Sequence, residues 1–480
     1  MKFKFKTVPY KHQLIALEKS CEKEEFALLM DMGTGKSKVL IDTIAHLYAK
    51  GKITSAVIFA PKGVYKNWVQ QEIPIHMPDH VDYKLAYWAS PLTAKLKKKI
   101  SAIWRDDFDL HILVVNIEAI SGDKAIRVVT RFIDNHLGKT LVAIDESTTI
   151  KNPKAKRTKS AILLGKKARY KRILTGSPIT KSPLDIYSQF AFLDQHLLGF
   201  QSYYSFCTRY ADMLKRSAGS HQYNQILGYR NLDELTKSIQ PFSYRVKKEE
   251  CLDLPEKMYI KRTIQLTPEQ KSIYADLKKN ATAILSDEDQ VTATTALTCL
   301  LRLHQVSCGF VNTDEGETLD IKNARLEELL SILEETNGKC LIWATYRHDI
   351  KAIENKIKQI YGENSVVSYY GDTKGEDRQD LVKKFQEDVE CKYFVGHPKT
   401  GGYGLTLVAA NTVIYYSNNY DLEVRLQSED RAHRIGQKNN VTYVDIVTEK
   451  TVDEVIVKAL RNKINIATQV LGEDFKKWLI

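Results

Sequence analysis

Short apolar runs that alternate with amphipathic stretches constrain the fold of this chain more than any other feature of its sequence. Four such runs lie in its first third, at Phe26–Met30, Ala56–Ala60, Ile112–Val115 and Leu141–Ile144. Their aliphatic and β-branched residues suit strands that are covered on both faces, as in a parallel sheet. Amphipathic segments such as Lys38–Lys50 lie between the runs. The pattern therefore predicts strand–helix–strand units and an α/β fold.

The same alternation returns after a stretch of different composition. Residues Asp194–Tyr244 are rich in Tyr and Phe, and Thr267–Phe310 has a helical pattern with little sign of strands. The elements expected beyond this stretch are a helix over Ala324–Asn337, a strand at Cys340–Thr345, a helix marked by Ile350, Ile353, Ile357 and Ile360, and strands at Tyr393–Val395 and Val413–Tyr416. The sequence thus predicts two α/β halves with a helical middle, joined near Arg245–Pro255.

Length and composition exclude several classes of protein. A chain of 480 residues is expected to form two or three domains. No run approaches the roughly 18 apolar residues of a transmembrane helix, and Met1–Lys6 is basic but leads into no apolar signal segment. The seven cysteines include no Cys-x-x-Cys pair, so neither a disulfide framework nor a zinc site is indicated. We expect reduced cysteines in a cytoplasmic protein without a membrane or zinc partner.

The positive charge of the chain is concentrated between Lys151 and Arg172. The formal net charge is +12, and this segment contains no Asp or Glu. Its ten basic residues are Lys151, Lys154, Lys156, Arg157, Lys159, Lys166, Lys167, Arg169, Lys171 and Arg172. Charges of the same sign that lie this close repel one another unless solvent or a polyanion screens them, and nucleic-acid phosphate is the obvious polyanion. A solvated surface without a ligand is the alternative.

A glycine-rich loop follows the first apolar run. The segment Asp31–Ser37 separates that strand from a predicted helix, and its glycines allow the backbone N–H groups to face phosphate oxygens. In such a loop Lys36 reaches the β- and γ-phosphates and Ser37 coordinates Mg²⁺. Met30 stands where the general pattern has glycine, and a chance turn is the alternative. The residues expected to bind nucleotide here are Gly33, Thr34, Gly35, Lys36 and Ser37.

An acidic pair, Asp145 and Glu146, follows the strand Leu141–Ile144. The end of a parallel strand places both carboxylates at the carboxyl edge of the sheet, beside the phosphate loop. Asp145 is expected to hold Mg²⁺, and Glu146 to position and deprotonate the attacking water.

Near the C-terminus, Gln427, Arg431 and Arg434 share one face if the segment is a single helix. A solvent-facing, salt-bridged helix is the alternative. The first half offers no arginine placed to stabilise charge in the transition state, so an arginine from the second half would supply it. Such a site is complete only when the halves close.

With these motifs in place, the chain resembles the Snf2 (SWI2/SNF2) branch of the superfamily 2 helicases and DNA translocases. The residues that carry the resemblance are Pro9–Gln13, Asp31–Ser37 (motif I), Ala60–Lys62 with Asn67 and Trp68 (Ia), Val115–Glu118 (Ib), Asp145–Pro153 (II), Leu174–Ile179 (III), Leu254–Lys257, Leu266–Gln270, Leu300–Cys308, Gly401–Leu407 (V), Tyr420, and Gln427–Gln437 (VI). Thr148 departs from the pattern, because the family usually has a His there that links motif II to motif III.

The resemblance implies two RecA-like parallel-sheet lobes with helical protrusions. Lobe 1 would span residues 1–245, with a protrusion from about 194, and lobe 2 residues 246–480, with a protrusion at about 258–320. It also implies a DNA-dependent ATPase that uses ATP and Mg²⁺. Tyr10 and Gln13 would recognise the adenine, and Gly404 and Gln427 would complete the nucleotide site. The DNA-binding residues would be Lys62, Trp68, Asn116, Lys151, Lys154, Lys156, Arg157, Lys159, Ser177, Lys399 and Thr400.

Three hypotheses for function stay open. The first is a translocase that unwinds, migrates or anneals forked or branched DNA in recombination, repair or replication. The second is a motor that displaces a DNA-bound protein such as RNA polymerase, and the third is a nucleotide-gated DNA clamp with little turnover. Little of the chain lies outside the motor, so we expect a minimal bacterial or phage member. It would act as a monomer on duplex, forked or branched DNA, in the nucleoid or in the cytoplasm of a host cell.

Overall fold

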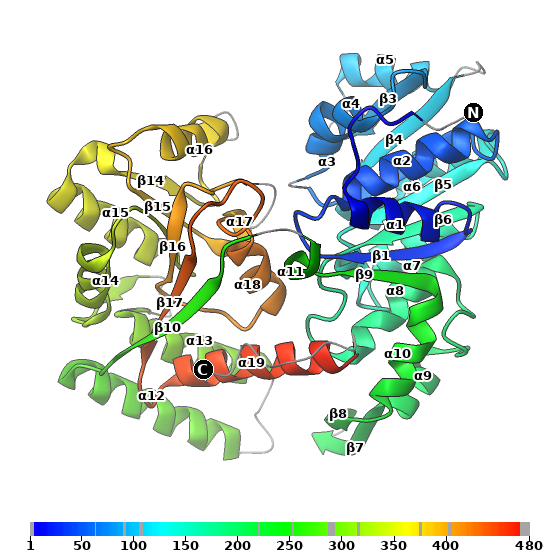
Figure 1. Ribbon diagram of the computed structural model, residues 1–480. Coiled ribbons are helices and arrows are strands. Elements are labelled where there is room, and N and C mark those ends of the chain that lie inside the picture. The colour runs from blue at the N-terminus through cyan, green and yellow to red at the C-terminus, as the bar shows by residue number, and fades with distance from the viewer. Residues whose placement is uncertain are drawn as a thin grey trace. The chain divides into compact units, whose positions relative to one another are not determined.

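The computed structural model describes residues 4–62, 64–89, 93–104, 109–218, 221–251, 254–286, 293–313, 317–373, 377–401 and 405–470 (Figure 1). The chain divides into two compact units. The first unit comprises Met1–Asp212, Ile226–Asp253 and Asn465–Ile480, and the second comprises Met213–Gln225 and Leu254–Ile464.

The first unit is built on a parallel sheet. Its strands are β1 (Glu25–Met30), β2 (Ser55–Ala60), β3 (Tyr83–Trp88), β4 (Leu110–Asn116), β5 (Thr140–Asp145), β6 (Tyr170–Leu174) and β9 (Ser243–Val246). Their order is β3-β4-β2-β5-β6-β1-β9, and at its centre Val57 pairs with Leu113 and with Val142. Every residue of β2 and β5 is buried, as expected for strands covered on both faces. The four strands predicted in this part of the chain are confirmed.

Helices and short turns connect these strands. They are α1 (Lys11–Ser20), α2 (Lys36–Ala49), α3 (Tyr65–Asn67), the π-helical turn η1 (Trp68–Glu72), α4 (Ile73–His76), α5 (Ala94–Ala102), η2 (Ile117–Ser121), α6 (Asp123–Asn135), η3 (Ser147–Ile150), α7 (Lys156–Gly165), η4 (Pro183–Asp185), α8 (Ile186–Leu193), α9 (Tyr203–Tyr210), α10 (Leu232–Ile239), η5 (Gln240–Phe242) and α11 (Lys248–Cys251). Ile41 and Ile44, three positions apart on α2, join Phe26 and Ile58 in one apolar core. The helical spacing of α2 therefore fixes which face packs on the sheet.

The protrusion from about residue 194 is only partly helical. Between α9 and α10 the chain forms an antiparallel hairpin of β7 (Ala211–Ala218) and β8 (His221–Tyr229). The helical prediction is wrong for this part. The sequence did contain a signal for the hairpin, because Gly219-Ser220 is a dipeptide typical of two-residue hairpin turns.

The second unit contains another parallel sheet. Its strands are β10 (Lys257–Ile264), β13 (Lys339–Trp343), β14 (Val366–Tyr369), β15 (Tyr393–Gly396), β16 (Ala410–Tyr415) and β17 (Val441–Thr448). They follow the order β10-β17-β16-β13-β15-β14. We expected β10 to belong to the protrusion at 258–320, yet it pairs with β17 along its whole length. As an edge strand it exposes Met258 and Ile260 and carries charged residues, so its sequence lacks the continuous apolar run of a central strand.

The remaining elements of the second unit are α12 (Pro268–Ser286), α13 (Ala293–Cys308), β11 (Phe310–Asn312), β12 (Thr318–Asp320), α14 (Arg325–Glu335), α15 (Arg347–Tyr361), η6 (Glu363–Ser365), α16 (Asp377–Glu387), α17 (Pro398–Gly401), α18 (Leu422–Glu429) and α19 (Val452–Val470), the last of these as far as Ile464. Apolar clusters lie on both sides of the sheet, one around Ile342 and Ile350 and another around Leu341 and Phe394. Adjacent residues of β13 thus point to opposite cores, as the alternation of a strand requires. The two α/β halves predicted from the sequence are confirmed.

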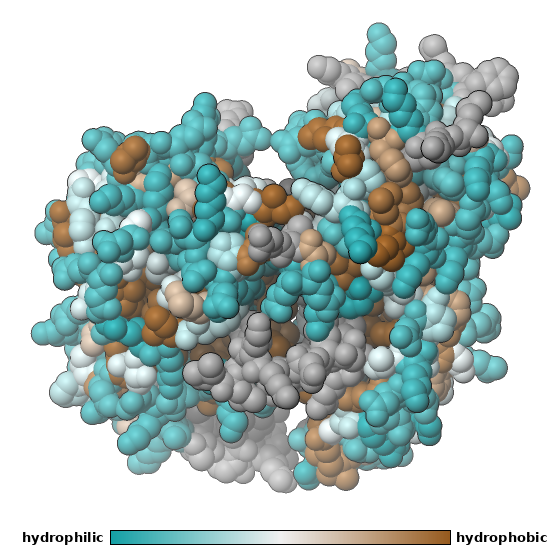
Figure 2. Space-filling model, viewed as in Figure 1, coloured by the Kyte–Doolittle hydropathy of each residue, from teal (hydrophilic) through white to brown (hydrophobic). Residues whose placement is uncertain are grey.

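The first sheet ends later than the predicted lobe boundary. Strand β9 pairs with β1 as far as Val246, and the second unit begins at Leu254, so a boundary after residue 245 would cut a strand. Hydrophilic side chains cover most of the face that Figure 2 shows. Among the described helices, none combines the length and the apolarity needed to cross a bilayer.

Candidate nucleotide site and nucleic-acid surface

The loop after β1 has the shape of a phosphate-binding loop. Gly33 and Gly35 adopt left-handed backbone conformations, with φ of 79° and 87°. Lys36 begins α2 and is buried, and its Nζ lies 3.4 Å from the carbonyl oxygen of Asp31. The first N–H groups of α2 have no partner within the helix, so the loop and helix end together present donors to an anion. Ser37 lies on the first turn of the same helix.

The segment before α1 is tied to this loop. The Gln13 side chain accepts from the N–H of Tyr10 at 3.0 Å and donates to the carbonyl oxygen of Thr34 at 3.0 Å. Nε2 of His12 lies 2.8 Å from the same carbonyl oxygen, and the His12 ring stacks with that of Tyr10. The expected adenine-recognition residues therefore lie beside the phosphate loop, with half of the Tyr10 surface exposed.

The acidic pair lies at the end of β5. Oδ1 of Asp145 accepts from the N–H of Glu146 at 3.0 Å, and Oδ2 accepts from the indole N–H of Trp68 at 2.8 Å. Burial raises the pKa of the Asp145 carboxyl, while the Trp68 bond and the charge of Lys36 oppose this rise. Glu146 has a φ of 49°, which is uncommon for a residue with a side chain and is a form of strain found at functional sites.

Trp68 is not a DNA contact in this structure. Its side chain has no exposed surface, and its polar atom bonds to Asp145. The DNA-binding prediction for Trp68 is therefore wrong. The prediction came from the resemblance of this segment to motif Ia, but Trp68, the first residue of the π-helical turn η1, is buried.

Sequence reasoning missed two residues that connect the motifs of the first unit. Gln189, fully buried on α8, accepts from the Ser147 hydroxyl and donates to the carbonyl oxygen of Pro178, both at 2.7 Å. Motif II is thus linked to motif III although Thr148 replaces the usual His.

Arg245 makes the second connection. It pairs with Asp31 at 2.8 Å and donates to the carbonyl oxygen of Gly176 at 3.1 Å. The backbone N–H of Lys248 also donates to the Asp31 carboxylate at 3.0 Å. The last strand of the first sheet is therefore bonded to the phosphate loop and to motif III. The sequence around Arg245, in a short strand beside β1, gave no local signal of this role.

In the second unit, the motif VI segment does not form one continuous helix, so the condition for a shared helical face is not met. Helix α18 ends at Glu429, and Arg431 and Arg434 follow in a turn and a bend. Glu429 is fully buried and accepts hydrogen bonds from Arg425 at 2.8 Å and from the hydroxyl of Tyr259 at 2.9 Å. These hydrogen bonds fix Glu429, the last residue of the helix. The sequence directly after Glu429 has no glycine or proline that would predict the end of a helix.

The two motif VI arginines nevertheless converge. Arg431 and Arg434 both donate to the carbonyl oxygen of Leu405, each at 3.1 Å. Arg431 also donates to the carbonyl oxygen of Gln427 at 2.9 Å, so the three predicted residues lie together. The expected nucleotide contact Gly404 lies outside the described residues.

Several predicted DNA contacts follow neighbouring strands of the first sheet. Lys62 comes two residues after β2 and is exposed, Asn116 ends β4, and Ser177 follows β6. Because parallel strands end at one edge, these residues lie at the same edge as Asp145. In the second unit, Lys399 and Thr400 lie on α17, and Lys399 is exposed.

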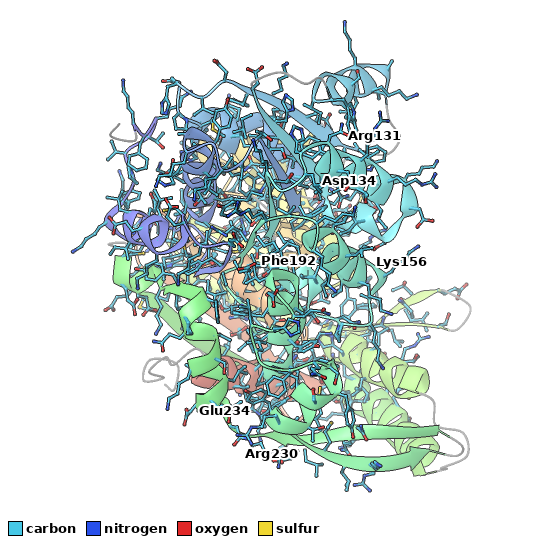
Figure 3. All side chains as sticks on the ribbon, turned by 90° about the vertical axis from the view of Figure 1, so that its right-hand side faces the viewer. Arg131, Asp134, Lys156, Phe192, Arg230 and Glu234 are labelled. Carbon is cyan, nitrogen blue, oxygen red and sulfur yellow. The ribbon has the colours of Figure 1, made fainter. Side chains whose placement is uncertain are left out.

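Protein partners account for much of the basic run. Lys167 pairs with Asp134, Arg169 with Glu24, Lys171 with Glu25 and Lys156 with Asp123 (Lys156 and Asp134 are labelled in Figure 3). Arg172 is fully buried and donates to the carbonyl oxygens of Ser20, Lys23, Glu24 and Lys171, and Lys151 donates to the Thr180 hydroxyl at 2.6 Å. Four of the five basic residues between Lys166 and Arg172 are therefore partnered by groups of the protein itself.

The start of the run differs from its end. Lys154 and Lys159 are exposed and Arg157 is half-buried, and no carboxylate in the described part of the chain pairs with any of the three. They lie at the N-terminal end of α7, whose first turn has no acidic residue. A cation is unfavourable at this end of a helix, so an anion here would be stabilised by the helix as well as by the side chains.

Comparison with known proteins gives two family matches. Residues 10–310 match the family described as SNF2-related domain, and residues 321–436 match the helicase conserved C-terminal domain. YwqA of Bacillus subtilis (strain 168), which carries the name of an ATP-dependent helicase/translocase, is 28% identical over 92% of this chain and 46% of its own length. A protein of Mycoplasma pneumoniae named as an uncharacterized ATP-dependent helicase is 24% identical over 97% of this chain and 42% of its own length. The chain thus spans less than half the length of these relatives.

Among solved structures, the Sulfolobus solfataricus SWI2/SNF2 ATPase core in complex with dsDNA is 23% identical, with a TM-score of 0.43 over 99% of both chains. The first family match alone covers well over half of the sequence. It confirms the resemblance seen in the motifs, and the chain belongs to the SNF2-related family.

Proposed function

We propose that this protein is an ATP-dependent DNA translocase that hydrolyses ATP to move along duplex or branched DNA. One observation carries the proposal. The phosphate loop after β1 and the carboxylate pair at the end of β5 lie at the same edge of the first sheet, because both strands pair in parallel with β6. Phosphoryl transfer depends mainly on positioning and charge neutralisation, which is what this set of groups offers.

The residues present fit Mg²⁺. Ser37 and Asp145 offer a hydroxyl and a carboxylate, the oxygen ligands that Mg²⁺ prefers. The bound ion would neutralise charge on the phosphates of ATP. Lys36 would contact the β- and γ-phosphates, and Glu146 would orient and deprotonate the attacking water. Tyr10 and Gln13 would hold the adenine.

The second unit would contribute the motif VI arginines. Arg431 and Arg434 converge on one carbonyl oxygen, so their positions depend on the same segment of backbone. We propose that they stabilise the transition state, with Gln427 and Gly404 at the nucleotide.

DNA would lie along the carboxyl edge of the first sheet. Lys62, Asn116 and Ser177 gather there, and the cations at the start of α7 would bind phosphate. In the second unit, Lys399 and Thr400 would contact the backbone. Such contacts fix position without reading sequence. The names of the two relatives above, which include helicase and translocase, support a nucleic-acid motor.

Fork or junction processing is the role we propose. Displacement of a DNA-bound protein and a DNA clamp with little turnover are the alternatives. DNA-stimulated turnover separates the clamp from both motors, and strand separation on forked against blunt duplex separates the two motors.

The deciding experiment compares ATPase rates on single-stranded, blunt duplex, forked and four-way DNA, with RNA as a control. Stimulation by branched DNA above blunt duplex supports our proposal. Wild-type turnover in Lys36→Ala would contradict the assignment of the phosphate loop. An absence of stimulation by any DNA would contradict the translocase.

A further inference from the structure

We propose that Trp68 is a positioning residue for the metal site, and that its indole N–H holds the Asp145 carboxylate in the orientation that binds Mg²⁺. The inference rests on the proposed function, because it takes Asp145 as a metal ligand. It gives Trp68 a role that does not require its side chain to be exposed or to contact DNA.

The bond between the two side chains is short and buried. Nε1 of Trp68 lies 2.8 Å from Oδ2 of Asp145, and Trp68 has no exposed surface. An indole N–H can only donate, so its partner must be an acceptor. A hydrogen bond to a charged carboxylate in a buried setting is among the stronger kinds. Burial disfavours the charged form of Asp145, and the Trp68 bond acts in the opposite direction.

The bond leaves Asp145 little rotational freedom. Its other oxygen, Oδ1, accepts from the backbone N–H of Glu146 at 3.0 Å. Each carboxylate oxygen therefore has one fixed donor, and each retains acceptor capacity for a metal or for a metal-bound water. Partners of this kind orient a metal ligand, and their removal typically lowers metal affinity 10- to 100-fold.

The local backbone is unusual at this point. Trp68 begins η1, a π-helical turn between the short helices α3 and α4. Such turns are rare and occur frequently at functional sites. Trp68 also packs in the same apolar core as Tyr65 and Ile73 of the flanking helices, so its ring is held in place while its N–H bonds to Asp145.

Trp68→Phe tests the proposal, with Trp88→Phe as the matched control. Trp88 is also buried in the first unit, at the end of β3, and within the described part of the chain it makes no hydrogen bond to a carboxylate. ADP affinity is measured by calorimetry with Mg²⁺ and with EDTA. For Trp68→Phe we expect the gain in affinity from Mg²⁺ to fall by about 10-fold or more, while the affinity in EDTA stays within about twofold of wild type. Trp88→Phe should keep both values.

Asp145→Asn distinguishes failure of this inference from failure of the proposed function. If Asp145→Asn keeps the full Mg²⁺ gain, the metal assignment itself is wrong. If Asp145→Asn loses the gain but Trp68→Phe keeps it, only the role of Trp68 is overturned. Should Trp68→Phe also lose affinity in EDTA, 3-benzothienylalanine at position 68 decides, because it keeps the indole shape without the N–H. A reduced Mg²⁺ gain in that protein supports the proposal, and a wild-type gain overturns it.

Discussion

At the scale of single residues, the phosphate loop depends on backbone conformations that few residues adopt. Gly35 has a φ of +87°, and a Cβ there would lie 2.2 Å from Nε2 of Gln13. The same Gln13 amide donates to Thr34, so a side chain at position 35 would disturb both the loop and the segment that supports it. Glycine is required here for conformation and for space.

Gly35→Ala is therefore expected to lose most of its ATP affinity. Gly51→Ala is a matched control, since Gly51 has a φ of +65° but nothing lies within 4 Å of its Cβ position. The control should lose about 1 kcal/mol of folding stability through backbone strain and keep its nucleotide affinity. Calorimetric titration with ATP analogue compares the two. Wild-type affinity in Gly35→Ala would contradict the loop geometry.

A second residue-scale prediction concerns Glu146. Glu146→Gln keeps the shape of the side chain but removes its basicity, so ATP should bind with nearly normal affinity. The turnover rate should fall by about 10²- to 10⁴-fold, the usual contribution of a general base. Single-turnover kinetics with bound ATP measure the step directly. An unchanged rate would mean that another group positions the water.

At the scale of elements, the end of α18 decides where the motif VI arginines lie. Removing an arginine that acts on the transition state lowers kcat far more than it changes KM. For Arg434→Ala we expect kcat to fall by about 10³-fold or more. Arg461→Ala, which removes an exposed arginine of α19, is the control and should retain wild-type kinetics. A change in KM alone would show that Arg434 contributes only to ground-state binding.

The start of α7 gives the second prediction at this scale. We expect a triple variant to bind every DNA sequence more weakly. In this variant Ser replaces Lys154, Arg157 and Lys159. The slope of log affinity against log salt should fall by about 0.9 for each lost phosphate contact on duplex DNA. ATPase activity without DNA should stay at its basal level.

The matched control removes three charges from the other end of the run, by replacing Lys166, Lys167 and Arg169 with Ser. Two of these pair with acids of the protein, so the salt slope should stay near wild type. Titrations at three salt concentrations measure both variants. Equal slopes for both triples would mean that the charges act only by long-range attraction.

At the scale of the whole molecule, buried charges tie the second unit together. Arg325, fully buried, pairs with Asp453 and so joins α14 to α19. His304 of α13 lies 3.5 Å from Asp453 and 2.7 Å from the Tyr346 hydroxyl. Burial, with the nearby Arg325 charge, lowers the pKa of His304 to about 4, although Asp453 opposes this.

In the unfolded chain His304 has the ordinary pKa of about 6.5. Between about pH 4 and 6.5, His304 is therefore protonated in the unfolded chain and neutral in the folded protein. Stability should therefore be complete above about pH 6.5 and decline as the pH falls towards 4, by up to about 3 kcal/mol from this group. Hydrogen exchange of α13 peptides at several pH values measures it. His304→Gln should show a flatter dependence, and identical slopes in the two proteins would contradict the assignment.

The sequence by itself determined the features that short segments encode. The apolar runs of the central strands predicted both sheets, because a strand buried on both faces must be apolar at successive positions. The phosphate loop and the Asp145–Glu146 pair could be located because each needs particular residues beside a strand end. The edge strand β10 and the β7–β8 hairpin were missed, since half-exposed strands carry polar residues that weaken the pattern.

Only the tertiary structure decided which distant residues meet. The partners of the basic run, Glu24, Glu25 and Asp134, come from other elements, and charge along the sequence says nothing of them. The bonds of Gln189 to Ser147 in motif II, and of Trp68 to Asp145, likewise join segments that are far apart in the chain. The physical reason is that a buried polar group must find a partner, and packing of the whole unit determines which one is within reach.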